Sequence, residues 1–186
     1  QGKRAEILQR AMEIFYKQGF HATGVDSVLA NTGISKRTLY KYFRSKEELI
    51  ASVVAHYQST LFDKIPAALS ARSASPVQQI LALFDLKADE FAVGDYSGCF
   101  AINAKLEFEG KDSAIEAACS RFYTLLEEFV AGLCTQAGCR NSAAAARQIM
   151  ILFEGGIVLG QIHHDPSTPN MARKMAEVIL QSDIKG

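Results

Sequence analysis

The sequence predicts an all-α protein, with a small N-terminal domain of three helices at residues 1–46 and a larger helical domain at residues 47–186. Two observations lead to this fold class. Apolar residues recur three or four positions apart along most of the 186 residues, and no segment has the strict alternation of a half-buried strand. Residues that start or stop helices also divide the chain into segments of helical length.

The first two helices of the N-terminal domain are followed by a glycine turn. Residues 5–20 have the apolar spacing of a helix, and Gly19 ends it. Residues 31–33 stop a second, short helix, which is indicated by Val25, Val28 and Leu29. Gly33 tolerates the left-handed backbone that a short turn between two helices commonly requires.

The third helix has one apolar side and one cationic, aromatic side. Ser35 is a favourable N-cap, so the helix is expected to begin at Lys36. Leu39 and Phe43 lie one turn apart and face the core. The more exposed positions are Lys36, Arg37, Tyr40, Lys41 and Arg44. This third helix of the domain follows a glycine turn. A helix with such a surface in that position is typical of the second helix of a helix-turn-helix, which enters the major groove of DNA.

Positive charge is concentrated in the same part of the chain. Ser45 and Glu48 form a capping box that starts the next helix, where Lys46 and the first backbone amides can contact a phosphate. Residues 1–50 carry nine basic against five acidic residues, whereas the remaining 136 carry eleven against fifteen. The net charge of zero argues against a protein that coats nucleic acids nonspecifically, yet the basic end can dock on DNA.

Beyond this point the sequence stays helical. Pro66 is expected to end the helix that starts at Ser45, and residues 71–75 are expected to form a loop. Ser75 and Pro76 then supply a cap and a first-turn proline. A further loop is expected at 94–98. The remaining helices are predicted at 76–93, 99–108, 112–136, 142–163 and 168–182.

The run TGISKRTLYKYFRSKEEL at residues 32–49, with the helix before it, resembles the N-terminal domain of the TetR family of transcriptional regulators. The resemblance implies an all-helical homodimer with an N-terminal helix-turn-helix DNA-binding domain and a larger C-terminal domain for ligand binding and dimerisation. It usually also implies repression that a small molecule relieves. We therefore expect a repressor that binds a palindromic operator in double-stranded DNA and is released by an inducer.

The resemblance also implies roles for single residues. Those that fall where the family reads bases are Lys36, Arg37 and Tyr40, and those that fall where it meets phosphates are Thr38, Tyr42 and Lys46. Lys41, on the same helix, completes the predicted DNA-binding set. Arg37 stands where many members have glycine, which adds a charged reader, and Val25 stands where a threonine often touches a phosphate. Leu29 replaces a common alanine, and we interpret it as core packing.

The last two predicted helices suit a subunit interface. Three glycines allow close helix approach, and several apolar residues surround them: Gly155, Gly156, Gly160, Ile149, Leu152, Phe153, Ile157 and Leu159. The family resemblance implies a homodimer through these two helices of each subunit. A dimer places two recognition helices about 34 to 36 Å apart, so that they reach successive major grooves. The alternative is a helix that is buried within one monomer.

A ligand pocket is expected among aromatic residues of the larger domain, together with two polar side chains. The predicted lining residues are Phe84, Phe91, Phe100, Asn103, Glu107, Phe122, Tyr123 and Phe153. Such a pocket suits a mostly apolar molecule with one or two polar groups. Plain core packing is the other explanation for most of these residues, because aromatic side chains at helical spacing usually pack.

Cys99 supports an alternative function, a repressor that senses oxidants or electrophiles. It lies in Ser97-Gly98-Cys99-Phe100 at a predicted helix start, where amide dipoles can lower the pKa of a thiol, and Lys105 follows in the same helix. A buried structural cysteine is the competing interpretation. The adjacent His163, His164 and Asp165 fall at a helix end, so neither a metal nor a cofactor is expected.

Two rival classes remain. An enzyme is not expected, because the chain has no glycine-rich phosphate loop, no G-x-S-x-G elbow and no H-E-x-x-H. A helical dimeric adaptor without DNA binding is the other rival, and the cationic set on the third helix argues against it. No uninterrupted apolar run approaches the roughly 20 residues that span a bilayer, and no signal peptide opens the sequence, so a cytoplasmic protein without membrane contact is expected.

Overall fold

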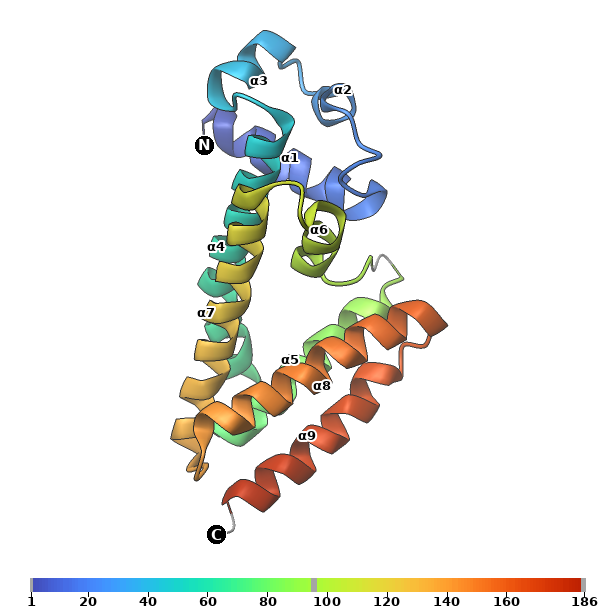
Figure 1. Cartoon of the computed structure of the whole chain (residues 1–186). Helices are drawn as coiled ribbons and strands as arrows, with labels where there is room; N and C mark the ends of the chain where they lie inside the picture. The colour runs from blue at the N-terminus through green and yellow to red at the C-terminus, as the bar shows by residue number, and fades with distance from the viewer. Residues whose placement is uncertain (1, 95–96, 185–186) are drawn as a thin grey trace. The chain divides into compact units, whose positions relative to one another are not determined.

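The computed structural model describes residues 2–94 and 97–184, and no strand occurs among them (Figure 1). This confirms the all-α prediction. The predicted loop at 94–98 includes residues 95 and 96, which lie outside the described residues. In the described part of the chain the helices are α1 (Lys3–Gln18), α2 (Val25–Leu29), α3 (Lys36–Tyr42), α4 (Lys46–Arg72), α5 (Pro76–Ala92), α6 (Phe100–Phe108), α7 (Ser113–Ala137), α8 (Ser142–His163) and α9 (Thr168–Ile184).

The chain forms two compact units, and each contains segments that are distant in sequence. The N-terminal unit comprises Gln1–Phe62 and Phe100–Phe122. The C-terminal unit comprises Asp63–Cys99 and Tyr123–Gly186. Helix α6 therefore belongs to the same unit as the helix-turn-helix, although more than fifty residues separate it from α3 in sequence. The functional boundary after residue 46 stays a prediction.

The core of the N-terminal unit is built around aromatic rings from the end of α1 and from α6. Phe20 lies just after α1, and its ring centroid is 5.3 Å from that of Phe15 and 5.1 Å from that of Phe100. Phe108 contacts the Phe20 ring edge-on at 6.3 Å. All four side chains are buried. Edge-to-face and offset ring contacts of this kind add to the free energy gained by apolar burial.

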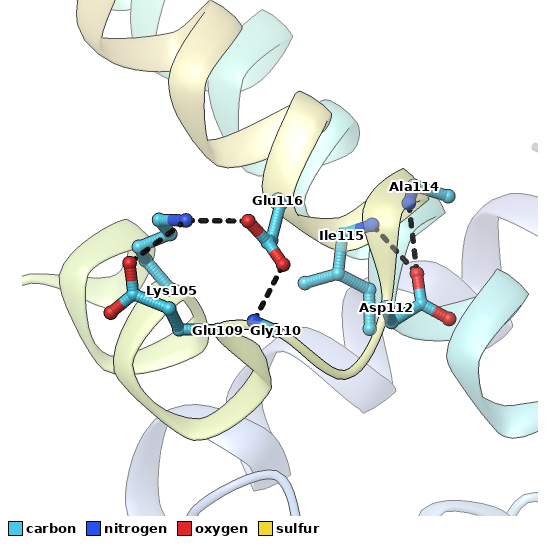
Figure 2. Close-up of polar contacts among 7 residues, drawn as sticks. All are labelled: Lys105, Glu109, Gly110, Asp112, Ala114, Ile115 and Glu116. Carbon is cyan, nitrogen blue, oxygen red and sulfur yellow. Dashed lines mark hydrogen bonds and ion pairs between the residues drawn. The ribbon is translucent and has the colours of Figure 1, made fainter.

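Polar contacts fix the junction between α6 and α7 within the same unit (Figure 2). Lys105 Nζ lies 2.7 Å from Glu116 Oε2, and Glu116 Oε1 accepts the backbone N–H of Gly110 at 2.8 Å. The Glu116 carboxylate raises the pKa of Lys105, and Lys105 in turn lowers the pKa of Glu116. Asp112 Oδ1 accepts the N–H groups of Ala114 and Ile115 and thereby caps α7.

Pro66 does not end the helix that begins at Lys46, so the prediction of a break there is wrong. Helix α4 continues through Pro66 to Arg72, and the loop before α5 is correspondingly shorter than the predicted 71–75. A proline inside a helix removes one backbone hydrogen bond. Ile65 and Leu69 lie one turn apart on either side of it, and both are buried. Their packing stabilises the helix against the cost of the proline.

In the C-terminal unit α8 packs extensively along α9, and α5 packs against α9 as well (Figure 1). Two of the glycines expected at a subunit contact lie against helices of the same chain. A Cβ added to Gly156 would meet the Cβ of Ala172 at 3.0 Å, and one added to Gly160 would meet Phe91 Cζ at 2.9 Å. Gly155, by contrast, has open space where a side chain would lie.

Helix α8 qualifies by length and composition as a membrane-spanning helix, with a mean hydropathy of 1.4 over an 18-residue window. The prediction rested on uninterrupted apolar runs, whereas this average tolerates the charged residues Arg147 and Glu154. Buried residues occur along the whole helix, from Ala145 to Gly160. The same length and composition are typical of a core helix within a folded domain.

Candidate nucleic-acid interface

The turn between α2 and α3 is held by local hydrogen bonds. Gly33 has a φ of 68°, the left-handed backbone that the sequence predicts. Thr32 Oγ1 donates to the carbonyl of Leu29 at 2.7 Å and accepts the N–H of Ile34 at 3.1 Å. Asn31 also has a positive φ, of 62°, which asparagine tolerates better than most residues. These bonds fix the position of α3 relative to α2.

Helix α3 begins at Lys36, as predicted, because the Ser35 side chain caps it. Ser35 Oγ accepts the N–H of Thr38 at 3.2 Å and lies 3.0 Å from the Thr38 hydroxyl. Leu39 is buried on the inner side of the helix. The residues that remain exposed are Lys36, Arg37, Tyr40, Lys41, Tyr42 and Arg44. Helix α3 thus places its cationic and phenolic side chains on the solvent side, and Thr38 is half-buried beside its cap.

Lys36 already has an ionic partner. Its Nζ lies 2.7 Å from Asp26 Oδ2 on α2, and both side chains are largely exposed. The hydrogen bond and the charge of Asp26 raise the pKa of Lys36, so the ammonium stays protonated. Exposed ion pairs are worth little in free energy, so a DNA phosphate or a base edge can compete for this lysine.

The start of α4 is tied to the turn that follows α1. Ser45 Oγ accepts the N–H of Glu48 at 3.1 Å, and Glu48 Oε2 accepts the N–H of Arg44 at 2.7 Å, one residue earlier than in a standard capping box. Lys46 Nζ donates to the carbonyl of His21 at 3.3 Å. The predicted phosphate contact at Lys46 therefore depends on the backbone position of His21.

Glu107, which is predicted to line a ligand pocket, accepts hydrogen bonds from the backbone of that turn. Its Oε1 accepts the N–H of Phe20 at 3.0 Å and its Oε2 accepts the N–H of His21 at 2.7 Å. The His21 ring stacks on Phe108 with centroids 4.6 Å apart. Sequence reasoning missed this contact, because 86 residues separate Glu107 from His21 and no local pattern marks the pair.

The predicted ligand residues divide between the two units. Phe100, Asn103, Glu107 and Phe122 belong to the N-terminal unit, and Phe84, Phe91, Tyr123 and Phe153 belong to the C-terminal unit. Within the N-terminal unit, the centroid of the Tyr57 ring is 5.1 Å from that of Phe100 and 5.5 Å from that of Phe122. Within the C-terminal unit, Phe84 and Phe153 form an edge-on pair at 5.5 Å. A common ligand pocket for the eight residues stays a prediction.

Three polar side chains meet in the C-terminal unit: Cys99, Tyr123 and Glu154. The Cys99 Sγ lies 2.8 Å from the Tyr123 hydroxyl and 3.8 Å from Glu154 Oε1. Burial raises the pKa of Glu154 to about 7, although the Tyr123 hydroxyl and the charge of Lys87 act to lower it. Burial also raises the pKa of the Tyr123 hydroxyl, which stays protonated.

Sequence reasoning missed Glu154, although it is the one charged residue in the apolar run from Ile149 to Gly160. It did single out Cys99 and Lys105. Lys105 pairs with Glu116 in the N-terminal unit. Sensing of oxidants or electrophiles through Cys99 stays a prediction.

Comparison with known proteins agrees with this geometry. Residues 7–53 match the family of bacterial regulatory proteins of the tetR family, and residues 76–181 match the C-terminal domain of transcriptional regulators similar to LmrA and YxaF. The chain is 28% identical over 164 residues to the transcriptional regulator LmrA of Bacillus subtilis, which covers 84% of this chain and 85% of LmrA.

Two further relatives have a local or a distant similarity. The transcriptional activator FasR of Mycolicibacterium smegmatis is 36% identical over 67 residues, 36% of this chain and 31% of FasR. The crystal structure of SCO4454, a TetR-family regulator from Streptomyces coelicolor, superposes with a TM-score of 0.85 at 24% identity, covering 97% of this chain and 95% of that one. The chain therefore belongs to the TetR family of DNA-binding transcriptional regulators, with a C-terminal domain of the LmrA/YxaF type.

Proposed function

We propose that the protein is a repressor that binds a palindromic operator through α3 and is released from it by a small, mostly apolar ligand. The observation that supports this best is the surface of α3, which is cationic and aromatic outside and anchored by buried Leu39 inside. In this proposal bases are read by Lys36, Arg37 and Tyr40, and phosphates are met by Thr38, Tyr42 and Lys46. Lys41, also exposed, adds to the positive potential.

A salt titration tests the DNA-binding part of the proposal. The affinity for a mixed-sequence duplex, measured by fluorescence anisotropy, should fall steeply as salt increases, with a slope of about −0.9 per phosphate neutralised in a plot of log K against log salt. We expect a slope of about −4 or steeper for a dimer that places two such surfaces on DNA. A slope near zero, or no binding at low salt, would contradict the assignment of this surface.

We further propose that the functional unit is a homodimer formed by α8 and α9 of each subunit. Two exposed apolar stripes support this proposal. The stripe on α8 consists of Ile151, Leu159 and Ile162, and the stripe on α9 consists of Met171, Met175 and Val178; these side chains are 48% to 68% exposed. They recur at helical spacing, and such contiguous apolar surface marks interfaces more often than solvent-facing helices. Ile149 and Ile157, also predicted for this contact, are buried within the chain.

The exchange of Met175 for glutamate should dissociate the dimer. A charge in the centre of an apolar interface would have to lose its hydration without a partner, so we expect the dimer dissociation constant to rise at least about tenfold. Sedimentation velocity over a concentration series measures this change. Leu106→Glu is the matched control, because Leu106 is also an exposed apolar residue, 68% exposed against 58% for Met175, and lies on α6. A dimer that is unaffected by Met175→Glu would exclude the α9 stripe as the interface.

Release by a ligand requires that the ligand bind the DNA-incompetent form more tightly than the competent one. The ligand-binding region is proposed to lie within residues 47–186, the larger domain of the predicted functional division. A cytoplasmic location, where the operator is accessible, is part of the same proposal.

A further inference from the structure

One carboxylate oxygen of Glu154, on α8, is buried. Among the residues that the structure describes, Oε2 of Glu154 is inaccessible to solvent and receives no hydrogen bond. Buried polar atoms are nearly always satisfied, because an unmet hydrogen bond is costly in an apolar surrounding. A buried carboxyl group with an unsatisfied oxygen indicates a hydrogen-bond donor from a bound ligand.

The other carboxylate oxygen of Glu154 lies in the polar cluster described above. Cys99 Sγ donates toward Oε1 across 3.8 Å, and the Tyr123 hydroxyl stabilises the charged form of the carboxyl. These groups come from the segment before α6, from α7 and from α8, so three parts of the fold hold the carboxylate in place. The cluster orients Glu154 through Oε1, whereas Oε2 accepts no hydrogen bond from the described residues.

The surroundings of Glu154 on α8 are apolar. Met150 lies one turn before it and Ile157 lies one turn after it, and both are buried. The preceding residue, Phe153, contacts the ring of Phe84 from α5. Glu154 is therefore an acidic group among buried apolar residues of α8.

The charges near Glu154 do not compensate it directly. Lys87 of α5 acts on the carboxyl, but its ammonium is 2.7 Å from Glu90 Oε2 in an ion pair of its own. Cys99 and Tyr123 contribute neutral donors. A carboxylate in this setting favours a cation and repels an anion.

We propose that Glu154 binds the protonated amino group of a mostly apolar ligand, which donates to Oε2 while Tyr123 and Cys99 hold Oε1. This inference rests on the proposed function of a ligand-responsive regulator and specifies its ligand class as lipophilic amines. Neutral alcohols lack the compensating charge, and carboxylates add a second negative charge, so both should bind less well.

Isothermal titration with matched probes tests this proposal. Phenylbutylamine and naphthylethylamine are compared with the alcohols and the carboxylates of the same carbon skeletons, on the full chain. We expect at least one amine to bind at least tenfold more tightly than its matched alcohol and carboxylate. Glu154→Gln, which keeps the shape of the side chain, should abolish that preference. Glu128→Gln, the same exchange at an exposed acid of α7, should leave it unchanged.

The pH dependence separates a binding role from a structural one. The free carboxyl titrates near pH 7 and must ionise to bind the ammonium, so amine affinity should increase about tenfold between pH 6 and pH 8. The amine itself stays protonated over this range. In Glu154→Gln the increase should be absent. In a second variant, Tyr123→Phe, the preference for the amine should be smaller than in wild type but still present.

Three results would overturn the proposal: no binding of either amine, equal binding of amines and alcohols, or an unchanged amine preference in Glu154→Gln. The salt titration of DNA binding is run on the same proteins without amine. Wild type and Glu154→Gln should then bind DNA alike. Loss of DNA binding in wild type would refute the proposed function, whereas loss of the amine preference alone would refute only the role of Glu154.

Discussion

Replacement of Phe20 by alanine should lower the free energy of unfolding by about 3 to 5 kcal/mol, the usual cost of removing a large buried aromatic side chain. The Phe20 ring is 1% exposed and contacts the rings of Phe15, Phe100 and Phe108. Its removal would leave a cavity between the end of α1 and α6. The same change should abolish DNA binding at temperatures where the variant is unfolded.

Urea denaturation at a fixed protein concentration measures this loss, since dimerisation makes the apparent stability depend on concentration. Gln18→Ala, at an exposed position two residues earlier, is the control and should change the free energy by less than about 0.5 kcal/mol. A loss below about 1 kcal/mol for Phe20→Ala would mean that α6 does not complete the core of the N-terminal unit.

The second large effect is expected at Arg37. Its replacement by alanine should weaken binding to the preferred DNA sequence by about 1 to 3 kcal/mol and relax the preference at one base position. The reason is geometric, because Arg37 is exposed near the start of α3 and a guanidinium can form two hydrogen bonds with a guanine edge. Binding to a panel of operators with single substitutions measures both effects.

Lys46→Ala is the matched comparison for Arg37→Ala. A lysine that meets a phosphate contributes to affinity for every sequence, so its loss should weaken the whole panel alike and make the salt slope shallower by about one. Unchanged affinity and unchanged base preference in Arg37→Ala would show that bases are read by other residues. A selective loss in Lys46→Ala would contradict its assignment to a phosphate.

The helix-turn-helix could be predicted from the sequence because its determinants are local. Ser35 caps the helix that begins one residue later, Gly33 supplies the positive φ of the turn, and Leu39 and Phe43 are buried one turn apart. Each of these features depends on neighbours within a few positions. Periodicity and capping rules describe such neighbours well.

Features set by distant contacts could not be predicted in the same way. Pro66 is a helix breaker by local rules, yet the burial of Ile65 and Leu69 keeps α4 continuous. No local pattern marks the hydrogen bonds of Glu107 to the backbone of Phe20 and His21, which lie 87 and 86 residues away in sequence. The pKa of Glu154 depends on its burial and on Tyr123, Lys87 and Cys99, which belong to other segments of the C-terminal unit.

Selection from randomised duplex DNA with the purified protein, at near-physiological salt, tests the central claim most directly. We expect enrichment of a palindrome whose half-sites lie about one helical turn apart, as two α3 helices of a dimer require, or of a longer site that binds two dimers. A folded and dimeric protein that enriches no sequence would contradict the claim that it is a sequence-specific regulator acting through α3.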